Sequence, residues 1–185
     1  MSHGKAVWVV VFGLLLANCE KVDLESENNE SGDNAYEQIV PTSYGHGTQE
    51  SPLIPEQIIK GENLPTNSYW VIGYVVGSTY RFMSNAAFVA ETENTSNILL
   101  SSDMNCENTE NCIPIELSTS SIQKTLCLHH NSHLFRQCVM VLGQYGRYFS
   151  RNGLRNVQAG YWLPDFNLST IKTAPTEWQE RNIMY

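Results

Sequence analysis

The fold class of this chain of 185 residues is indicated most clearly by residues 69–77, Tyr69-Trp70-Val71-Ile72-Gly73-Tyr74-Val75-Val76-Gly77. The β-branched and aromatic side chains of this stretch favour a long strand, and a glycine closes the run. Apolar side chains occupy both alternating faces, so we expect both faces of the strand to be partly covered. Gly73 in the middle predicts a bulge or a sharp bend, as a strand needs at the corner of a small barrel.

On the amino-terminal side of this strand, residues 54–61 predict a short helix. Pro55 suits the first helical position and Gly61 suits the residue that follows the last turn. On the carboxy-terminal side, residues 88–90 and 97–101 predict strands interrupted by a polar loop. Residues 112–117 predict another strand, which Pro114 limits to an edge or to a bulged position because proline lacks a backbone N–H.

A second short helix is expected after Ser118-Thr119-Ser120-Ser121, whose hydroxyl groups suit the N-cap position. Ile122 and Leu126 follow at i, i+4 spacing, which is typical of an amphipathic helix. Residues 138–145 and 154–162 then predict two last strands, joined by a loop over residues 147–153.

The chain therefore predicts a mainly β fold with about three strands, a helix and two more strands. This is the element order of the OB-fold, a small and partly open five-stranded barrel with a short helix between strands 3 and 4.

Six short motifs form a specific set, although each is weak alone: Trp-Val-Ile-Gly-Tyr-Val-Val-Gly (70–77), Asn-Ile-Leu-Leu (97–100), Cys-Ile-Pro-Ile-Glu-Leu (112–117), Val-Leu-Gly (141–143), Tyr-Phe (148–149) and Gly-Leu-Arg-Asn-Val (153–157). Together they resemble an uncharacterised family of OB-fold-like domains of Bacteroidota-type secreted and surface lipoproteins. The resemblance covers residues 53–162. The chain departs from the family pattern at Ser150, where glycine is usual, and at residues 128–131. The resemblance implies a fold, but it implies no catalytic residue and no ligand.

The first 18 residues have the layout of a secretory signal of the lipoprotein type. Lys5 precedes an apolar run from Ala6 to Leu16, which as a helix would rise only about half the thickness of a bilayer core. The run ends at Leu16-Ala17-Asn18-Cys19, which resembles the bacterial lipobox, although Gly, Ala or Ser is usual at the position of Asn18. We therefore expect Cys19 to be the lipidated residue. The alternative is a plain secretory signal with an ordinary thiol.

Residues 19–50 are expected to be the lipidated cysteine followed by an acidic, disordered tether. From residue 20 on they carry eight acidic residues against one basic residue and few large apolar side chains, whereas residues 51–163 carry eight acidic and seven basic residues. An acidic run after a lipidated cysteine resembles the export signal of surface lipoproteins of the Bacteroidota type; a soluble linker is the alternative. The predicted location is the outer membrane, at the cell surface, with a periplasm-facing or secreted protein as alternatives.

The remaining chain is long enough for one domain. We expect that domain over residues 51–163 and a tail over residues 164–185, which includes Trp178 and whose role the sequence leaves open.

The strongest candidate for a ligand site is the predicted loop between the last two strands. It interleaves aromatic rings with guanidinium groups, as single-stranded nucleic-acid and sugar binders do, and this loop often contacts ligands in OB-folds. Trp70 and Tyr74 belong to a second candidate, a platform on which a sugar ring could stack. In both cases the alternative is that the rings pack the core and rim. The candidate binding residues of the loop are Tyr145, Arg147, Tyr148, Phe149, Arg151 and Arg155.

The cysteines other than Cys19 lie in a compartment where disulfides can form. Cys106 and Cys112 flank a short polar loop and are the predicted pair; a small buried apolar residue is the alternative for Cys112. A tract with Cys127, His129 and His133 has no spacing typical of zinc sites, so we predict no metal and no other cofactor.

No nucleophile elbow, phosphate loop or metal-binding His-Glu helix occurs in the sequence, so we predict no enzyme. The predicted function is a non-catalytic binding module of the cell envelope, attached to the membrane through its lipid. A glycan or an envelope protein is the favoured partner. The alternatives are an assembly protein that docks another envelope component and an oligonucleotide-binding OB-fold. Nucleic acid is disfavoured because the domain is nearly neutral, and no oligomeric state follows.

Overall fold

The computed structural model of the chain describes residues 36–61 and 64–174. Strand β2 (Ser68–Tyr80) is the predicted long strand, and it has two partners. Its first half pairs with β6 (Cys138–Tyr148) and its second half pairs with β4 (Asn97–Ser101), both antiparallel. Tyr74 is the residue at which β2 passes from one neighbour to the other, since it pairs with both Cys138 and Ser101. The register shift lies between Val75 and Gly77, just after the bend expected at Gly73.

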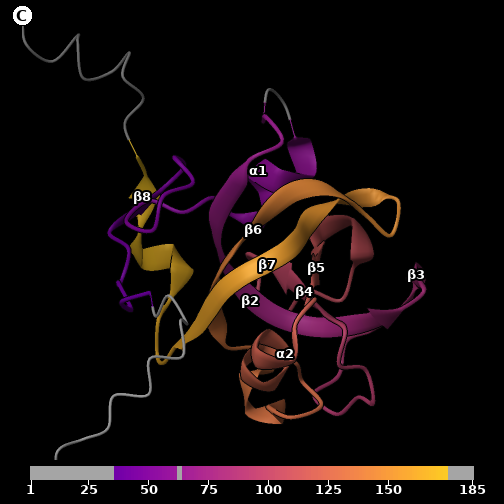
Figure 1. The fold of residues 1–185 in the computed structure, drawn as a ribbon. Helices are drawn as coiled ribbons and strands as arrows, with labels where there is room; N and C mark the ends of the chain where they lie inside the picture. Colours follow the sequence, from indigo (N-terminus) through magenta and orange to yellow (C-terminus); the bar gives the residue numbers. More distant parts are fainter. Residues whose placement is uncertain (1–35, 62–63, 175–185) are drawn as a thin grey trace, which may run out of the picture. The chain divides into compact units, whose positions relative to one another are not determined.

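The sheet closes on itself through three further pairings (Figure 1). Strand β5 (Ile113–Glu116) runs antiparallel to β4 and parallel to β7 (Arg151–Leu163), and β7 runs antiparallel to β6. Because β6 also pairs with β2, the five strands form a ring-like sheet. The prediction of a mainly β fold is therefore confirmed.

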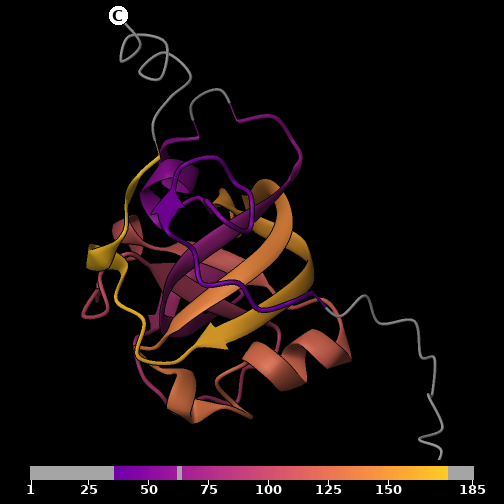
Figure 2. The ribbon, with the colours of Figure 1, turned by 90° about the vertical axis from the view of Figure 1, so that its left-hand side faces the viewer.

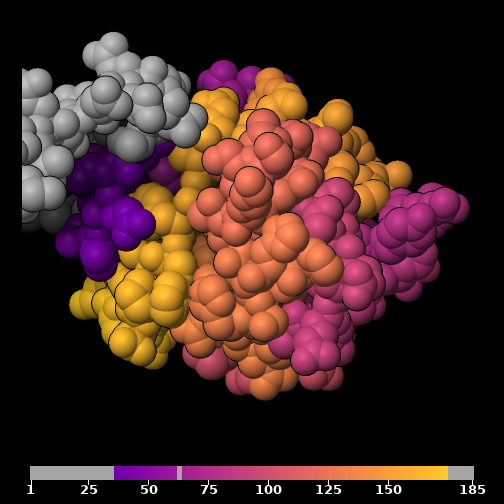
Figure 3. Space-filling model, turned by 60° about the horizontal axis from the view of Figure 1, so that its bottom comes forward, coloured from indigo at the N-terminus to yellow at the C-terminus, as the bar shows by residue number. Residues whose placement is uncertain are grey.

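The prediction of a strand at residues 88–90 is wrong. Strand β2 continues to Tyr80, turns at Arg81 (φ 64°) and pairs with β3 (Phe82–Ala87), whereas residues 88–96 form no strand. The sequence did not predict β3 because the polar Ser84 and Asn85 interrupt the apolar pattern that is typical of a strand. Figure 3 shows the end of β2 and β3 (magenta, at the right) standing out from the body.

Pro114 does not place its strand at an edge, because β5 lies between β4 and β7. Its pairing with β7 is short and is limited to Ile115 and Leu154. Gly153 lies against Pro114, where an added Cβ would come 2.3 Å from the proline carbonyl oxygen. The absence of a side chain at residue 153 therefore allows the two strands to approach where proline cannot donate a ladder hydrogen bond.

Both predicted helices form. Helix α1 (Pro55–Lys60) begins at the proline and ends at Gly61 in the left-handed conformation (φ 60°). Helix α2 (Ser120–Leu126) lies between β5 and β6, and the Thr119 hydroxyl accepts a hydrogen bond from the Ile122 N–H at its start. Among the described residues, α2 is the only α-helix of seven or more residues, and no helix there is both long and apolar enough to cross a membrane.

The core consists of two clusters on the two faces of the ring, as the apolar residues on both faces of β2 predicted. All five ring strands contribute to the first cluster, through Val71, Ile98, Ile115, Val141 and Leu154, and the helices add Ile58 and Leu126 to it. The second cluster lies on the opposite face of β2. It contains Trp70, Ile72, Tyr74 and Val76, together with Leu168 from the 3-10 turn η3 (Leu168–Thr170).

Residues 36–50 are folded onto the outer face of the sheet, although the sequence predicted a tether up to residue 50 (Figure 2). The Tyr161 hydroxyl accepts hydrogen bonds from the Ile39 N–H (3.1 Å) and the Gln49 side chain (3.0 Å). Strand β1 (Ser43–Tyr44) pairs in parallel with β8 (Lys172–Thr173), so part of the predicted tail is also ordered. The predicted signal peptide, Cys19 and Trp178 lie outside the described residues.

Candidate functional site

The predicted loop between the last two strands is a tight hairpin. Strand β6 ends at Tyr148 and β7 begins at Arg151, so Phe149 and Ser150 form the whole turn. Both have positive φ angles (49° and 62°), as a type I′ turn requires at both central positions. Glycine and asparagine are the usual signals of this turn, and their absence explains why the sequence suggested a longer loop.

The aromatic residues of the hairpin are partly buried. The rings of Tyr148 and Phe149 lie 4.1 Å apart between centroids. Phe149 packs against the second core cluster and Tyr145 packs against the first. Burial, and then the nearby Glu116 carboxylate, raise the pKa of the Tyr148 hydroxyl. These rings therefore contribute to packing at least as much as to any ligand surface.

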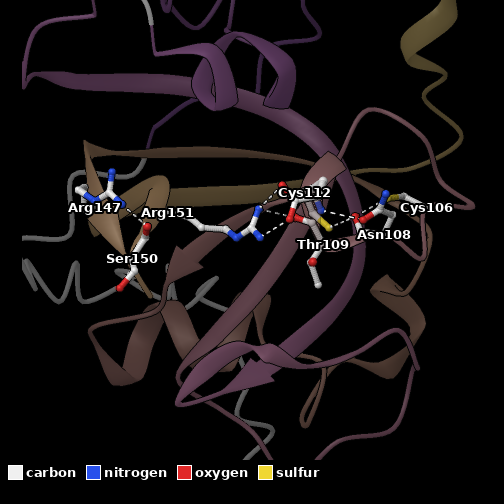
Figure 4. Close-up of polar contacts among 8 residues, drawn as sticks. Cys106, Asn108, Thr109, Cys112, Arg147, Ser150 and Arg151 are labelled. Carbon is white, nitrogen blue, oxygen red and sulfur yellow. Dashed lines mark hydrogen bonds and ion pairs between the residues drawn. The ribbon is translucent and has the colours of Figure 1, made fainter.

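The three arginines of the hairpin have three different environments, and Figure 4 shows those of Arg147 and Arg151. The Arg151 guanidinium donates to both carboxylate oxygens of Glu110, at 3.0 and 2.5 Å. Arg155 contacts the Glu116 carboxylate at 3.4 Å. Arg147 is exposed and folds back to donate to the carbonyl of Ser150, away from the Arg151 guanidinium. Two of the three positive charges are thus neutralised by a carboxylate, and Arg147 is bound by a backbone oxygen.

A cavity of about 240 Å³ lies beside this hairpin. It is open to solvent and is lined by residues of the hairpin, of α1 and of the 3-10 turn η1 (Thr109–Asn111). The Asn152 amide donates to the Ile59 carbonyl at 3.2 Å and so connects β7 to α1 across it. The cavity is small for a drug-sized ligand, and it suits a group of the size of one sugar ring. Its lining residues are Ile59, Glu110, Cys112, Arg147, Arg151 and Asn152.

The sequence predicted Arg147 and Arg151 in this site and missed the other four lining residues. Glu110 is 41 residues away from Arg151 along the chain, and no spacing rule connects the two. A second cavity, of about 320 Å³, is lined by Gly45, Leu53, Gln57, Lys60 and Leu64. No sequence pattern pointed to this cavity, and Gly45 belongs to the segment that was expected to be a tether.

Trp70 and Tyr74 do not belong to the site. Both are buried in the second core cluster, with 6% and 4% of their surface exposed. The Trp70 ring packs against Tyr36 and Tyr161. The Tyr74 hydroxyl accepts a hydrogen bond from the Leu168 N–H at 3.0 Å. The predicted stacking platform is therefore wrong for these two residues, which pack the core instead.

The described cysteines are free thiols. Cys106 and Cys112, the predicted disulfide pair, both donate to the carbonyl of Asn108, at 3.3 and 3.0 Å, and no disulfide joins them in this structure. Cys127 and Cys138 are buried in the two core clusters. Within residues 36–61 and 64–174, no three His, Cys, Asp or Glu side chains gather as metal ligands would.

The ion pair in the cavity wall predicts how Glu110 titrates. Its hydrogen bonds to Arg151 hold the pKa of the Glu110 carboxyl below the ordinary value. A carboxyl whose pKa is lowered by folding stabilises the protein above its unfolded pKa, and this contribution is lost as the pH falls through the folded pKa. We expect Arg151→Gln to raise the titration midpoint of Glu110 toward the ordinary value, measured by carbon-13 NMR of the side-chain carboxyl. An unchanged midpoint would show that the pair does not persist in solution.

Comparison with known proteins places the folded part of the chain in a family. No curated protein and no solved structure matches the chain significantly. A family model does match it, over residues 56–163, which include every strand of the ring and the candidate cavity. This range nearly coincides with the domain predicted over residues 51–163 and covers more than half of the chain. The chain therefore belongs to the family described as a domain of unknown function, DUF6359.

Proposed function

We propose that this protein is a non-catalytic binding module of the cell envelope and that the hairpin cavity binds a glycan. In this proposal the domain is OB-fold-like and is attached to the outer membrane through a lipid on Cys19. The leader, the Leu-Ala-Asn-Cys motif and the acidic run after it support the anchor. The order of the five ring strands, with a helix between the third and the fourth, supports the OB-fold assignment.

The chemistry of the cavity lining is the observation that supports a glycan. Arg151 and Asn152 offer planar donors and Glu110 offers acceptors within one small cavity, and sugar hydroxyls both donate and accept hydrogen bonds. Ile59 adds an apolar surface that suits the C–H face of a sugar ring. The Arg147 guanidinium donates to the carbonyl of Ser150 in its own turn and contacts no carboxylate among the described residues. It is therefore able to pair with a sugar carboxylate. The favoured glycan therefore carries acidic groups.

The state of Glu110 supports binding over hydrolysis. A glycosidase needs one carboxylic acid with a raised pKa that protonates the leaving group. Glu110 is the carboxylate of this cavity, and Arg151 lowers its pKa instead. A carboxylate that stays ionised and bidentately paired is suited to orient a ligand and not to donate a proton.

A glycan array tests the proposal with a matched pair of variants. We expect the protein to bind acidic glycans, and Arg147→Ala to weaken binding about tenfold or more, which corresponds to about 1.4 kcal/mol. Arg155→Ala removes the same group from the same hairpin but outside the cavity, and we expect it to leave the affinity unchanged. Equal losses in both variants, or no binding to any glycan, would contradict the assignment of the cavity.

The anchor is tested separately. Full-length protein expressed in a bacterial host with radiolabelled palmitate should incorporate the label, and Cys19→Ala should abolish it. Label that persists in Cys19→Ala would disprove lipidation at this residue. A partner protein from the envelope that binds Arg147→Ala as well as the wild type would favour the assembly role over a glycan site.

A further inference from the structure

Cys106 and Cys112 share one hydrogen-bond acceptor. The carbonyl of Asn108 accepts from the Cys106 thiol at 3.3 Å and from the Cys112 thiol at 3.0 Å (Figure 4). It also accepts from the Asn111 N–H at 3.1 Å. Two sulfurs at these distances from one oxygen lie no more than about 6.3 Å apart, and a disulfide between them requires the two side chains to rotate toward each other. Both thiols are nearly buried, with 7% and 2% of the residue surface exposed.

Cys112 also lines the hairpin cavity, beside Arg151 and Glu110. Cys112 therefore has this cavity beside it, whereas Cys106 lies outside the lining and keeps a slightly larger exposed share of its surface, 7% against 2%. Cys127 and Cys138 line neither of the two cavities described above. Cys112 therefore differs from Cys127 and Cys138 because it lines a cavity and they do not.

We propose that Cys106 and Cys112 form a reversible dithiol–disulfide pair, which reacts with small-molecule disulfides that reach Cys112 through the cavity. The proposal goes beyond ligand binding and does not depend on the nature of the ligand.

The reaction has two exchange steps. The Cys112 thiolate attacks one sulfur of the external disulfide, which forms a mixed disulfide and releases the first external thiolate. The Cys106 thiolate then attacks the Cys112 sulfur, which forms the internal disulfide and releases the second external thiolate. The two protons lost by the cysteines are taken up by the two released thiolates. The protein loses two electrons and the external disulfide gains them.

Burial governs the rate of this reaction. Burial, and then the neighbouring Cys106, raise the pKa of the Cys112 thiol, whereas Arg151 partly opposes this rise. The thiolate is therefore scarce at neutral pH. Because only the thiolate attacks, we expect a slow reaction whose rate rises about tenfold between about pH 7.5 and about pH 8.5.

Oxidation would also act on the wall of the cavity. The segment between the two cysteines supplies both partners of the Arg151 guanidinium, the Thr109 carbonyl (3.4 Å) and the Glu110 carboxylate. In the reduced state the thiols hold this segment through Asn108. In the oxidised state a covalent bond closes the loop from residue 106 to residue 112, and the Asn108 carbonyl loses both thiol donors.

Peptide mapping of the full-length protein tests the proposal. The protein is first reduced, then incubated with oxidised glutathione, alkylated and digested with trypsin. Cys106 and Cys112 lie on one tryptic peptide, residues 82–124, whereas Cys19, Cys127 and Cys138 lie on three others. We expect the 82–124 peptide to lose about 2 Da and to resist alkylation, which is the signature of a disulfide within it. The peptides with Cys127 and Cys138 should show no change.

Two single variants identify the order of the steps. Cys106→Ser should accumulate a glutathione adduct on Cys112, because the second step is blocked. Cys112→Ser should carry about fivefold less adduct on Cys106, which does not line the cavity. The proposal would be overturned by a wild-type protein that keeps the glutathione adduct on Cys112 without forming the internal disulfide. It would also be overturned by oxidation of Cys127 and Cys138 at the same rate.

Discussion

Gly153→Ala is expected to lower the free energy of unfolding by about 3 kcal/mol, the upper end of the usual cost of adding atoms to a packed site. A Cβ at this residue would lie 2.3 Å from the Pro114 carbonyl oxygen and 3.0 Å from its Cγ atom. The obstacle is a backbone atom of β5 and a rigid ring, so no side chain can rotate out of the way. Relief requires β5 and β7 to separate at their one described pair, Ile115 and Leu154. Urea denaturation followed by circular dichroism measures the loss.

Gly146→Ala is the matched control. Gly146 lies directly opposite Gly153 in the same hairpin, and an added Cβ there would meet no atom within 4 Å. We expect it to change the free energy of unfolding by no more than about 0.5 kcal/mol, as for an ordinary surface substitution. If both alanines were equally costly, the loss would reflect the conformational freedom of glycine in the hairpin, and the close approach of β5 and β7 would be contradicted.

Removal of residues 36–50 is expected to lower the free energy of unfolding by about 3 kcal/mol or more. This segment donates two hydrogen bonds to the Tyr161 hydroxyl, and its Gly47 carbonyl accepts from the Trp70 N–H at 2.9 Å. Each such bond contributes about 1 kcal/mol net, and the ring of Tyr36 on Trp70 adds further contact. The segment also supplies β1, the partner of β8.

The measurement compares a fragment that begins at residue 36 with one that begins at residue 51, the boundary expected from the sequence. Thermal and urea denaturation should show the longer fragment to be the more stable. In the shorter one we expect tryptophan fluorescence shifted to longer wavelength, because Trp70 loses its cover. Tyr161→Phe in the longer fragment removes only the hydroxyl contacts and should give an intermediate stability. Equal stability of the two fragments would show that the segment does not dock in solution.

The candidate site shows which contacts can be predicted from short sequence patterns and which cannot. The prediction placed Arg147 and Arg151 in one hairpin because they lie close in the chain, and this is correct. It listed Arg147, Arg151 and Arg155 together as ligand-binding residues, whereas Glu110 and Glu116 each pair with one of them. These carboxylates come from η1 and β5, about 40 residues earlier in the chain. The order of charges along the sequence does not show which segments this far apart lie side by side in the folded protein.

Trp70 and Tyr74 fail as predicted ligand residues for a related reason. Both side chains lie on the outer face of β2. In a sheet with one solvated face, this face would be exposed to solvent and available to a ligand. Here Tyr36 packs on Trp70 and Leu168 binds the Tyr74 hydroxyl. The segments that contain Tyr36 and Leu168 lie before and after the predicted domain in sequence. Both segments are mostly acidic or polar, so the sequence did not indicate that their few apolar residues would pack on the sheet.

The elements with strong local causes could be predicted from the sequence alone. Pro55 and Gly61 fixed the ends of α1, the Thr119 hydroxyl fixed the start of α2, and β-branched residues fixed the long strand β2. Each of these causes acts within one or two turns of backbone. Three contacts could be read only from the folded protein: β6 closes the ring against β2, Glu110 meets Arg151, and residues 36–50 cover Trp70. These contacts depend on which edges and faces come together when the whole core is buried, and that burial is a property of the folded chain and not of any short stretch of it.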